Sequence, residues 1–326
     1  MSSCIRAIKP LSLVTSSDVL VTEKLEDYLK TLEGAFSNNS VRAIKSDVIQ
    51  FAIWCHENGR RSLPTLAETI SHYVDEMSVT YAPATVKRRL SSIGHFHRAF
   101  GEEDFTKSLD VTIAVRRMDR MYGTRQKQAT AFTSEDVEVI ISMTGSELID
   151  LRDIAMLLTA RDLLGRRSEI VLLDVEDVVF NADGSGMIMI RQSKTDPTGQ
   201  GAEMWVSCNT VNAVQKWLQS SGIDDGPLFR SVRKGGRIGG ALSVDDVSRR
   251  YKILAKRADL DPRGISGHSP RVGMTQDLCA AGMELTELML AGRWKSPKMP
   301  ARYAEKTNAA RGAVAKYYSI KAHHGV

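Results

Sequence analysis

The sequence predicts a mainly α-helical protein with two domains, the second of which also contains a small antiparallel β-sheet. The chain has 326 residues, enough for about two domains of roughly 150 residues each. Apolar residues recur at helical spacing through the first third, and no convincing strand precedes residue 180. Two apolar stretches, at 186–191 and 202–207, flank a polar turn with Gly and Pro, which indicates a β-hairpin.

The first domain is expected to cover residues 1–122 and to contain only helices. Apolar side chains lie at helical spacing between 40 and 58, and Asn58-Gly59 ends that helix. Thr65 and Glu68 fit a capping box that opens the next helix. The other helices expected here cover 25–34, 84–100 and 109–121, the last of them ended by Gly123.

A polar, basic stretch without periodicity follows, and residues 123–130 are expected to form a linker. The second domain, expected at 131–326, begins with a helix capped by the run Thr133-Ser134-Glu135-Asp136. The apolar stretch 151–164 predicts a buried helix ahead of the hairpin. After the hairpin, further helices are expected over 209–219, 243–258, 269–281 and 285–291, and in a C-terminal tail at 308–318.

Composition excludes several classes of protein. With 42% hydrophobic and 25% charged residues, the chain is not collagen-like, mucin-like or wholly disordered. Its four cysteines are scattered without a CxxC pair, so neither a disulfide framework nor a zinc knuckle is expected. No apolar run approaches the roughly 18 residues of a membrane span, and no signal peptide is seen. We expect a cytoplasmic protein, associated with the nucleoid through DNA, or a nuclear one in a eukaryotic host.

Positive charge is more clustered than the net charge of +5 indicates. Residues 77–101 include no Asp or Glu, and three further basic clusters lie at 116–127, 228–240 and 249–257. One cluster alone would equally fit a solvated helix face, whereas four of them favour nucleic-acid binding. The residues expected to contact DNA are Lys45, Thr85, Lys87, Arg88, Arg89, Arg125, Arg233, Lys234, Arg249 and Arg250.

The sharpest chemical signal is the run Gly267-His268-Ser269-Pro270-Arg271. Pro270 suits the first turn of a helix, and Gly282 suits its end. His268 and Arg271 then lie on one side of the helix start, beside free backbone N–H groups. This arrangement would hold an oxyanion such as a phosphate. Taken alone, the run would also fit a capping histidine and a surface arginine.

Four further motifs accompany this run: Arg166-Arg167-Ser168-Glu169, Ser193-Lys194-Thr195, Gly292-Arg293-Trp294 and Ala301-Arg302-Tyr303. With these motifs in this order, the sequence resembles the tyrosine recombinase (phage integrase) family, most closely its Cre-like branch. The ordered set is highly specific, whereas each motif alone is weak. The resemblance is strong from about residue 127 to 318 and looser before it. It implies an all-α core-binding domain followed by a mostly α catalytic domain with a small antiparallel sheet.

The resemblance implies roles for seven residues. They are Arg166 and Arg271 as catalytic arginines, Glu169 as their acidic support, Lys194 as the mobile hairpin lysine, His268 as the partner of Arg271, Trp294 in place of a second histidine, and Tyr303 as the nucleophile. Arg167 competes with Arg166 for the first position. Tyr317 and Tyr318 compete with Tyr303, but they lie far beyond the Gly-Arg-Trp run.

These residue types suit phosphodiester transfer through the 3′-phosphotyrosine intermediate that the resemblance implies. Two guanidiniums can hold the nonbridging oxygens bidentately without losing their charge. Trp294 can donate a hydrogen bond but cannot shuttle a proton, and Lys194 is expected to protonate the leaving 5′ oxygen. The sequence has neither a P-loop nor carboxylates spaced for two metal ions. No cofactor and no metal site are therefore expected.

By resemblance, the partners are double-stranded DNA with an inverted-repeat target and further copies of the chain. Four protomers on two sites would exchange strands through a Holliday junction. The tail helix at 308–318 would dock into a neighbouring protomer, and packing on its own domain is the alternative. Asp245 and Asp246 would accept from cytosine or, as we favour, cap their helix. The alternative functions are a type IB topoisomerase, a telomere resolvase-like enzyme and a non-catalytic DNA-binding protein.

Overall fold

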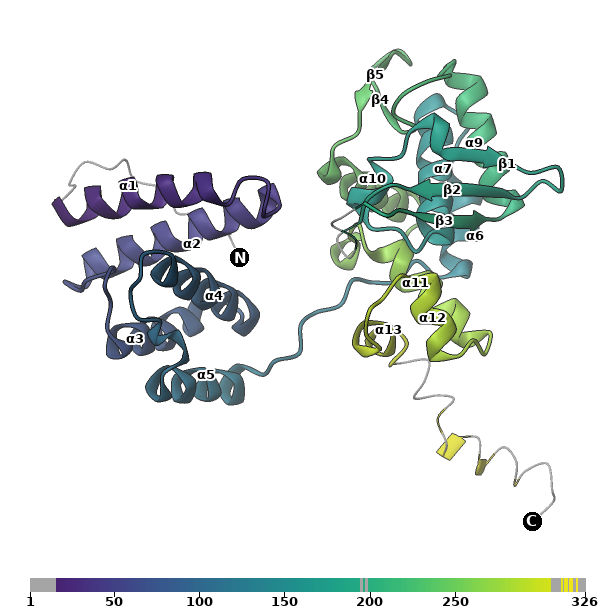
Figure 1. The fold of residues 1–326 in the computed structure, drawn as a ribbon. Helices are drawn as coiled ribbons and strands as arrows, with labels where there is room; N and C mark the ends of the chain where they lie inside the picture. The colour runs from purple at the N-terminus through teal and green to yellow at the C-terminus, as the bar shows by residue number, and fades with distance from the viewer. Residues whose placement is uncertain are drawn as a thin grey trace. The chain divides into compact units, whose positions relative to one another are not determined.

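The computed structural model describes residues 16–193, 196 and 199–305, together with positions 312, 314, 315, 317, 318 and 321 of the tail. The chain divides into two compact units, residues 1–126 and 127–326, which Figure 1 draws. The described part is mostly helical with small antiparallel sheets, so the predicted fold class is confirmed. Within it, no helix is both long and apolar enough to cross a membrane.

From residue 16 onward, where the description begins, the first unit consists of five α-helices and a short 3₁₀ turn. The helices are α1 (Ser16–Thr31), α2 (Asn38–Glu57), α3 (Ala67–Thr80), α4 (Pro83–Ala99) and α5 (Leu109–Tyr122). Phe51 and Trp54 of α2 each meet Tyr73 of α3 edge-on, with ring centroids 5.0 and 5.1 Å apart. These aromatic contacts, which favour edge-to-face geometry, belong to one of the hydrophobic clusters of the first unit.

Local signals explain where most of these helices begin and end. The Ser37 hydroxyl accepts from the backbone N–H of Ser40 at the start of α2, and Gly123 ends α5 with a φ of 72°. The capping box expected at Thr65 is wrong. Leu66 precedes α3 without any side-chain cap, because Thr65 is buried with its hydroxyl turned into the unit.

The second unit contains the remaining α-helices and β-strands. They are α6 (Ser134–Met143), α7 (Leu148–Asp162), α8 (Arg167–Ile170), β1 (Val178–Phe180), β2 (Gly186–Ile190), β3 (Ala202–Val206), α9 (Cys208–Ser221), β4 (Arg230–Val232), β5 (Ile238–Ala241), α10 (Val244–Arg257), α11 (Ser269–Ala280), α12 (Leu285–Ala291) and α13 (Lys298–Tyr303). Thr133 and Asp136 form the capping box predicted for α6. The tail helix expected at 308–318 falls mostly outside the described residues and stays a prediction.

The predicted hairpin is present as β2 and β3, which pair antiparallel with Ile188 opposite Met204. Strand β1 adds to β2 as a third strand, and β4 and β5 form a separate hairpin. These three strands were not predicted, because each is too short to display a clear alternation of apolar and polar residues. The expectation of one sheet, with no strand before residue 180, is therefore corrected: the described part of the chain contains two sheets, the first beginning at Val178.

Helix α7 is the structural centre of the second unit. It packs against α9, α11 and β3 and lies behind the sheet in Figure 1. Its buried residues share one hydrophobic core with Ile188 and Ile190 of β2 and Val206 of β3. Helix α11 approaches the chain just before α6 so closely that a Cβ on Gly273 would lie 1.7 Å from the Phe132 carbonyl oxygen. This contact requires glycine, and it fixes the first half of α11 beside the segment that precedes α6.

Candidate active site

The turn after α7 carries Arg166 and Glu169 into the interior of the second unit. Arg166 precedes α8 and Glu169 is the third residue of that helix, so their side chains face each other. Nη1 of Arg166 donates to Oε1 of Glu169 at 2.5 Å, and the backbone N–H of Arg166 donates to Oε2 at 3.0 Å. Glu169 is 3% exposed, whereas the Arg166 side chain is 14% exposed. The buried carboxylate thus holds an arginine that remains accessible.

Arg271 lies in the first turn of α11 and is 2% exposed. Its Nη1 donates to the carbonyl of Leu164, and its Nη2 donates to the carbonyl of Gly292 at 2.5 Å. Desolvation and the charge of Arg166 lower the pKa of Arg271 to about 9, so it stays protonated at pH 7. The alternative interpretation of Arg271 as a surface arginine is wrong.

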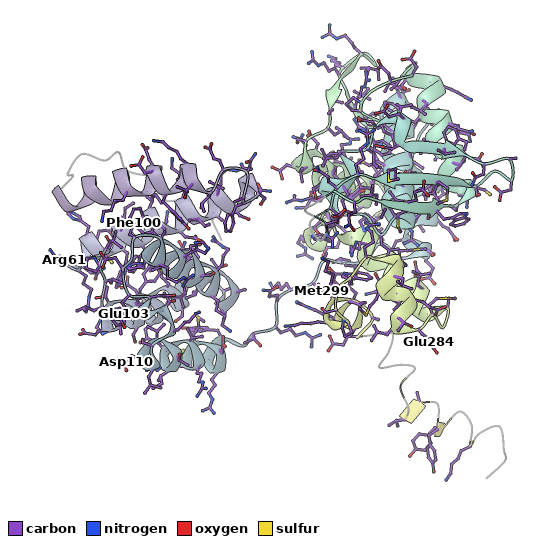
Figure 2. The ribbon with its side chains drawn as sticks, in the orientation of Figure 1. Arg61, Phe100, Glu103, Asp110, Glu284 and Met299 are labelled. Atoms are coloured by element: carbon purple, nitrogen blue, oxygen red, sulfur yellow. The ribbon has the colours of Figure 1, made fainter. Side chains whose placement is uncertain are left out.

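Trp294 lies against Arg271, and Tyr303 lies against Trp294. The guanidinium carbon of Arg271 lies 4.2 Å from the centroid of a Trp294 ring, a cation–π contact. The rings of Trp294 and Tyr303 meet edge-on, with centroids 6.0 Å apart. Tyr303 ends α13, the helix that Met299 marks in Figure 2. Its backbone carbonyl accepts from Nε2 of Gln276 on α11 at 3.2 Å, which ties α13 to the same helix as Arg271.

His268 stands immediately before α11 and beside three arginines. Its side chain makes no capping hydrogen bond, which does not support the alternative interpretation as a capping histidine. Desolvation, together with the charges of Arg271, Arg167 and Arg166, lowers the pKa of His268 below 6.5. The imidazole is therefore neutral at pH 7 and able to accept a proton.

Arg167 takes a different direction from Arg166. Its Nη1 lies 3.2 Å from Oδ1 of Asp245 and 3.2 Å from the hydroxyl of Ser248, both at the start of α10. This placement supports Arg166 over Arg167 as the arginine of the cluster. Asp246 caps α10 in a capping box with Ser243, as favoured from the sequence. Asp245 is exposed and pairs with Arg167.

Lys194 lies outside the described residues, so its expected role as the hairpin lysine stays a prediction. The neighbouring Arg191, at the end of β2, is held by Asp174, Glu176 and Asp177 at 2.9, 2.6 and 2.7 Å. These three ion pairs anchor the chain directly after β2, the first strand of the predicted hairpin. In the described ranges, no group of three His, Cys, Asp or Glu side chains is placed to bind a metal ion.

The residues expected to contact DNA differ in exposure. Arg89 is only 7% exposed, donates to the hydroxyl of Tyr73 at 3.1 Å and lies over the Tyr81 ring. Arg250 pairs with the buried Asp153 at 2.6 Å. We correct the expectation for Arg89 and Arg250, because their guanidiniums are committed to structural contacts. Thr85 is half-buried, and the exposed members of the set are Lys45, Lys87, Arg88, Arg125, Arg233, Lys234 and Arg249.

One residue at the site was not assigned a role from the sequence. Nη2 of Arg293 donates to Oε2 of Glu169 at 2.6 Å, and its Nη1 donates to the carbonyl of Leu163 at 3.1 Å. The only available signal was its place between Gly292 and Trp294 in the motif. Sequence position does not reveal that this side chain turns inward, because the direction depends on an unusual backbone conformation.

The Phage integrase family model matches residues 130–310, more than half of the chain. The chain therefore belongs to the phage integrase family. The tyrosine recombinase identity predicted from the motifs, and with it the enzyme class, is confirmed.

Two curated relatives and one solved structure illustrate the similarity. Recombinase cre of Escherichia phage P1 is 28% identical over 303 residues, covering 86% of this chain and 88% of that protein. An integrase/recombinase xerD homolog of Selenomonas ruminantium is 29% identical over 290 residues, covering 86% and 85%. The structure of XerH site-specific recombinase bound to a palindromic difH substrate, a post-cleavage complex, has a TM-score of 0.66. It is 13% identical and covers 92% of this chain and 89% of that one.

Proposed function

We propose that this recombinase cuts and rejoins DNA at a specific site, with Tyr303 as its nucleophile. The observation that carries the proposal is the contiguous arrangement of Arg166, Arg271, Trp294 and Tyr303 around the start of α11. Two arginines there are held by a carboxylate and by backbone carbonyls, and the Tyr303 ring meets the indole edge-on. Such an arrangement supplies positive charge and one nucleophile to a single phosphate.

The proposed reaction exchanges one phosphodiester bond for another. The Tyr303 oxygen forms a bond to phosphorus while the bond from phosphorus to the 5′ oxygen breaks, which leaves a 3′-phosphotyrosine and a free 5′-hydroxyl. The phenol proton passes to His268, which is neutral at pH 7 because its pKa is lowered. Lys194 gives a proton to the leaving 5′ oxygen. In the second step a 5′-hydroxyl attacks the phosphotyrosine, so the bond energy is conserved and ATP is not consumed.

Charge stabilisation is the main contribution of the site to this reaction. The nonbridging oxygens gain negative charge in the phosphorane-like transition state, and the guanidiniums of Arg166 and Arg271 are oriented before the substrate arrives. A preorganised donor of this kind is worth about 2.7–4 kcal/mol. The indole N–H of Trp294 adds a donor that cannot take up a proton in exchange.

The proposal extends to the target and the assembly. Residues 1–122 serve as the core-binding domain, 123–130 as the linker and 131–326 as the catalytic domain. Their target is double-stranded DNA with an inverted repeat, which a symmetric pair of protomers reads. The palindromic substrate of the related XerH structure supports this reading. Four protomers joined through the tail at 308–318 would exchange strands by a Holliday junction. Deleting 308–326 should then abolish tetramers while monomers still bind.

The test is covalent capture of DNA by the full chain. A target duplex is first selected from a random library by its binding to Tyr303→Phe. A nick is then placed in this duplex, so that cleavage traps the covalent complex. We expect wild type to form this complex and Tyr303→Phe to bind equally well without forming it. Tyr317→Phe and Tyr318→Phe are the matched controls, and both should retain cleavage. If Tyr303→Phe formed the covalent complex, the assignment of Tyr303 as nucleophile would be wrong. If wild type formed no covalent complex, the proposed cleavage activity would be wrong.

A further inference from the structure

Arg293 combines a backbone conformation typical of glycine with a side chain that turns into the proposed active site. Its φ is +54°, in the left-handed region that residues with a Cβ adopt rarely. Among the non-glycine residues that the structure describes, only Leu164 and Asp259 share a positive φ. Such conformations persist where surrounding contacts enforce them, and they concentrate at functional sites. The Arg293 side chain therefore makes contacts that outweigh the backbone cost.

Those contacts lie on the acidic residue of the site. Arg293 donates to Oε2 of Glu169 at 2.6 Å and to the Leu163 carbonyl at 3.1 Å, and its side chain is 13% exposed. Desolvation lowers the pKa of Arg293, and the negative charge of Glu169 opposes this effect. One carboxylate thus stabilises the positive charge of Arg293 in the interior. Leu163, which accepts from Arg293, is followed by Leu164, which accepts from Arg271 through its carbonyl.

Glu169 is consequently shared between two guanidiniums. Its Oε1 accepts from the side chain of Arg166, and its Oε2 accepts from Arg293 and from the Arg166 backbone. If Arg166 alone faced this carboxylate, the pair would be close to neutral, and Arg166 would have little charge left for a phosphate. With Arg293 present the three groups carry one net positive charge, and the neighbouring Arg271 raises the total for the cluster to about two.

We propose that Arg293 is a positioning residue for strand transfer, supplying the counter-charge of Glu169 so that Arg166 remains available to the phosphate. The inference rests on the proposed function. With Arg293, the net charge of the cluster matches that of a phosphorane whose nonbridging oxygens carry two negative charges. Arg293 acts through Glu169 and does not itself touch the DNA.

A double-mutant cycle tests this coupling, because Arg293 and Glu169 lie in direct contact. The measurement is the single-turnover rate of covalent complex formation at saturating DNA, on the nicked duplex selected with Tyr303→Phe. We expect Arg293→Gln to slow this step by about ten- to a hundredfold and to leave the DNA dissociation constant unchanged within about twofold. In a Glu169→Gln background the same substitution should cost less than about threefold or accelerate the step, because it restores the net charge.

Controls separate positioning from folding. Arg263→Gln removes one positive charge from an exposed arginine of the same unit and should leave the saturated rate unchanged. If Arg293→Gln does not fold, Arg293→Gly carries the same test, because glycine relieves the left-handed backbone. Equal slowing in both Glu169 backgrounds, or a wild-type rate for Arg293→Gln, would overturn the inference alone. Failure of wild type to form the complex would instead overturn the proposed function.

Discussion

Gly292→Ala is the most direct way to displace the indole at the site without removing any functional group. A Cβ built on Gly292 lies 2.0 Å from Cζ3 and 2.3 Å from Cε3 of Trp294. Carbon atoms in contact are ordinarily about 3.5–4.0 Å apart, so the ring must retreat by about 1.5 Å. That movement breaks the 4.2 Å contact of Trp294 with Arg271. It also disturbs the Gly292 carbonyl, which accepts from the same guanidinium.

Overpacking of this kind costs about 1–3 kcal/mol of stability, and a misplacement of about 1 Å in an active site costs about a hundredfold in rate. We therefore expect Gly292→Ala to fold with a lowered Tm and to form the covalent complex about a hundredfold more slowly at saturating DNA. Gly240→Ala is the matched control, because nothing lies within 4 Å of a Cβ there. Cleavage at the wild-type rate by Gly292→Ala would refute the argument that the indole is positioned for the reaction.

Three other predictions concern protonation, DNA contacts and metals. The NMR titration of His268 in the DNA-free protein should give a pKa below 6.5, and Arg167→Met should raise it. As the pH falls below 6.5, His268 of the unfolded chain binds a proton before His268 of the folded protein does. The free energy of unfolding therefore decreases as the pH falls from 6.5 to the pKa of the folded protein. Arg249→Gln should reduce the slope of log K against log salt concentration for DNA binding by about one. Arg250→Gln should instead lower Tm, because it leaves the buried Asp153 without its ion-pair partner. Cleavage should continue in excess EDTA, and a loss that magnesium restores would indicate a nuclease mechanism.

The helical part of the fold was predictable because its signals are local. Apolar periodicity, the Thr133 and Asp136 capping box, and Gly123 each act within a few residues. The same rule failed at Thr65, where burial of the side chain overrides its capping preference. Strands β1, β4 and β5 were missed because a strand of three or four residues has no periodicity to detect. Their pairing depends on residues distant in the sequence.

The candidate site was predictable in its members but not in its geometry. Motif order identified Arg166, Arg271 and Tyr303, yet nothing in the sequence placed Arg271 in the interior. Basic residues that are neighbours in the sequence also do not all lie on one exposed surface. Consecutive helix residues point about 100° apart, so Arg88 and Arg89 face different environments, one half-exposed and the other buried. Burial depends on the partner helix, which a run of basic residues does not reveal.

The charges of the cluster explain why stability and activity should oppose each other at this site. Before DNA binds, desolvation and the positive charge of Arg166 lower the pKa of both Arg271 and Arg293, so the proximity of these arginines to Arg166 is unfavourable in the free protein. Positive φ angles at Leu164 and Arg293 add strain to the chain segments that hold them. A phosphate between the arginines would relieve the repulsion, and the transition state would relieve it further because it carries more negative charge. Neutralising one of these arginines should therefore lower Tm by less than its lost hydrogen bonds alone would, while it slows cleavage, because the same repulsion opposes folding and favours the phosphorane.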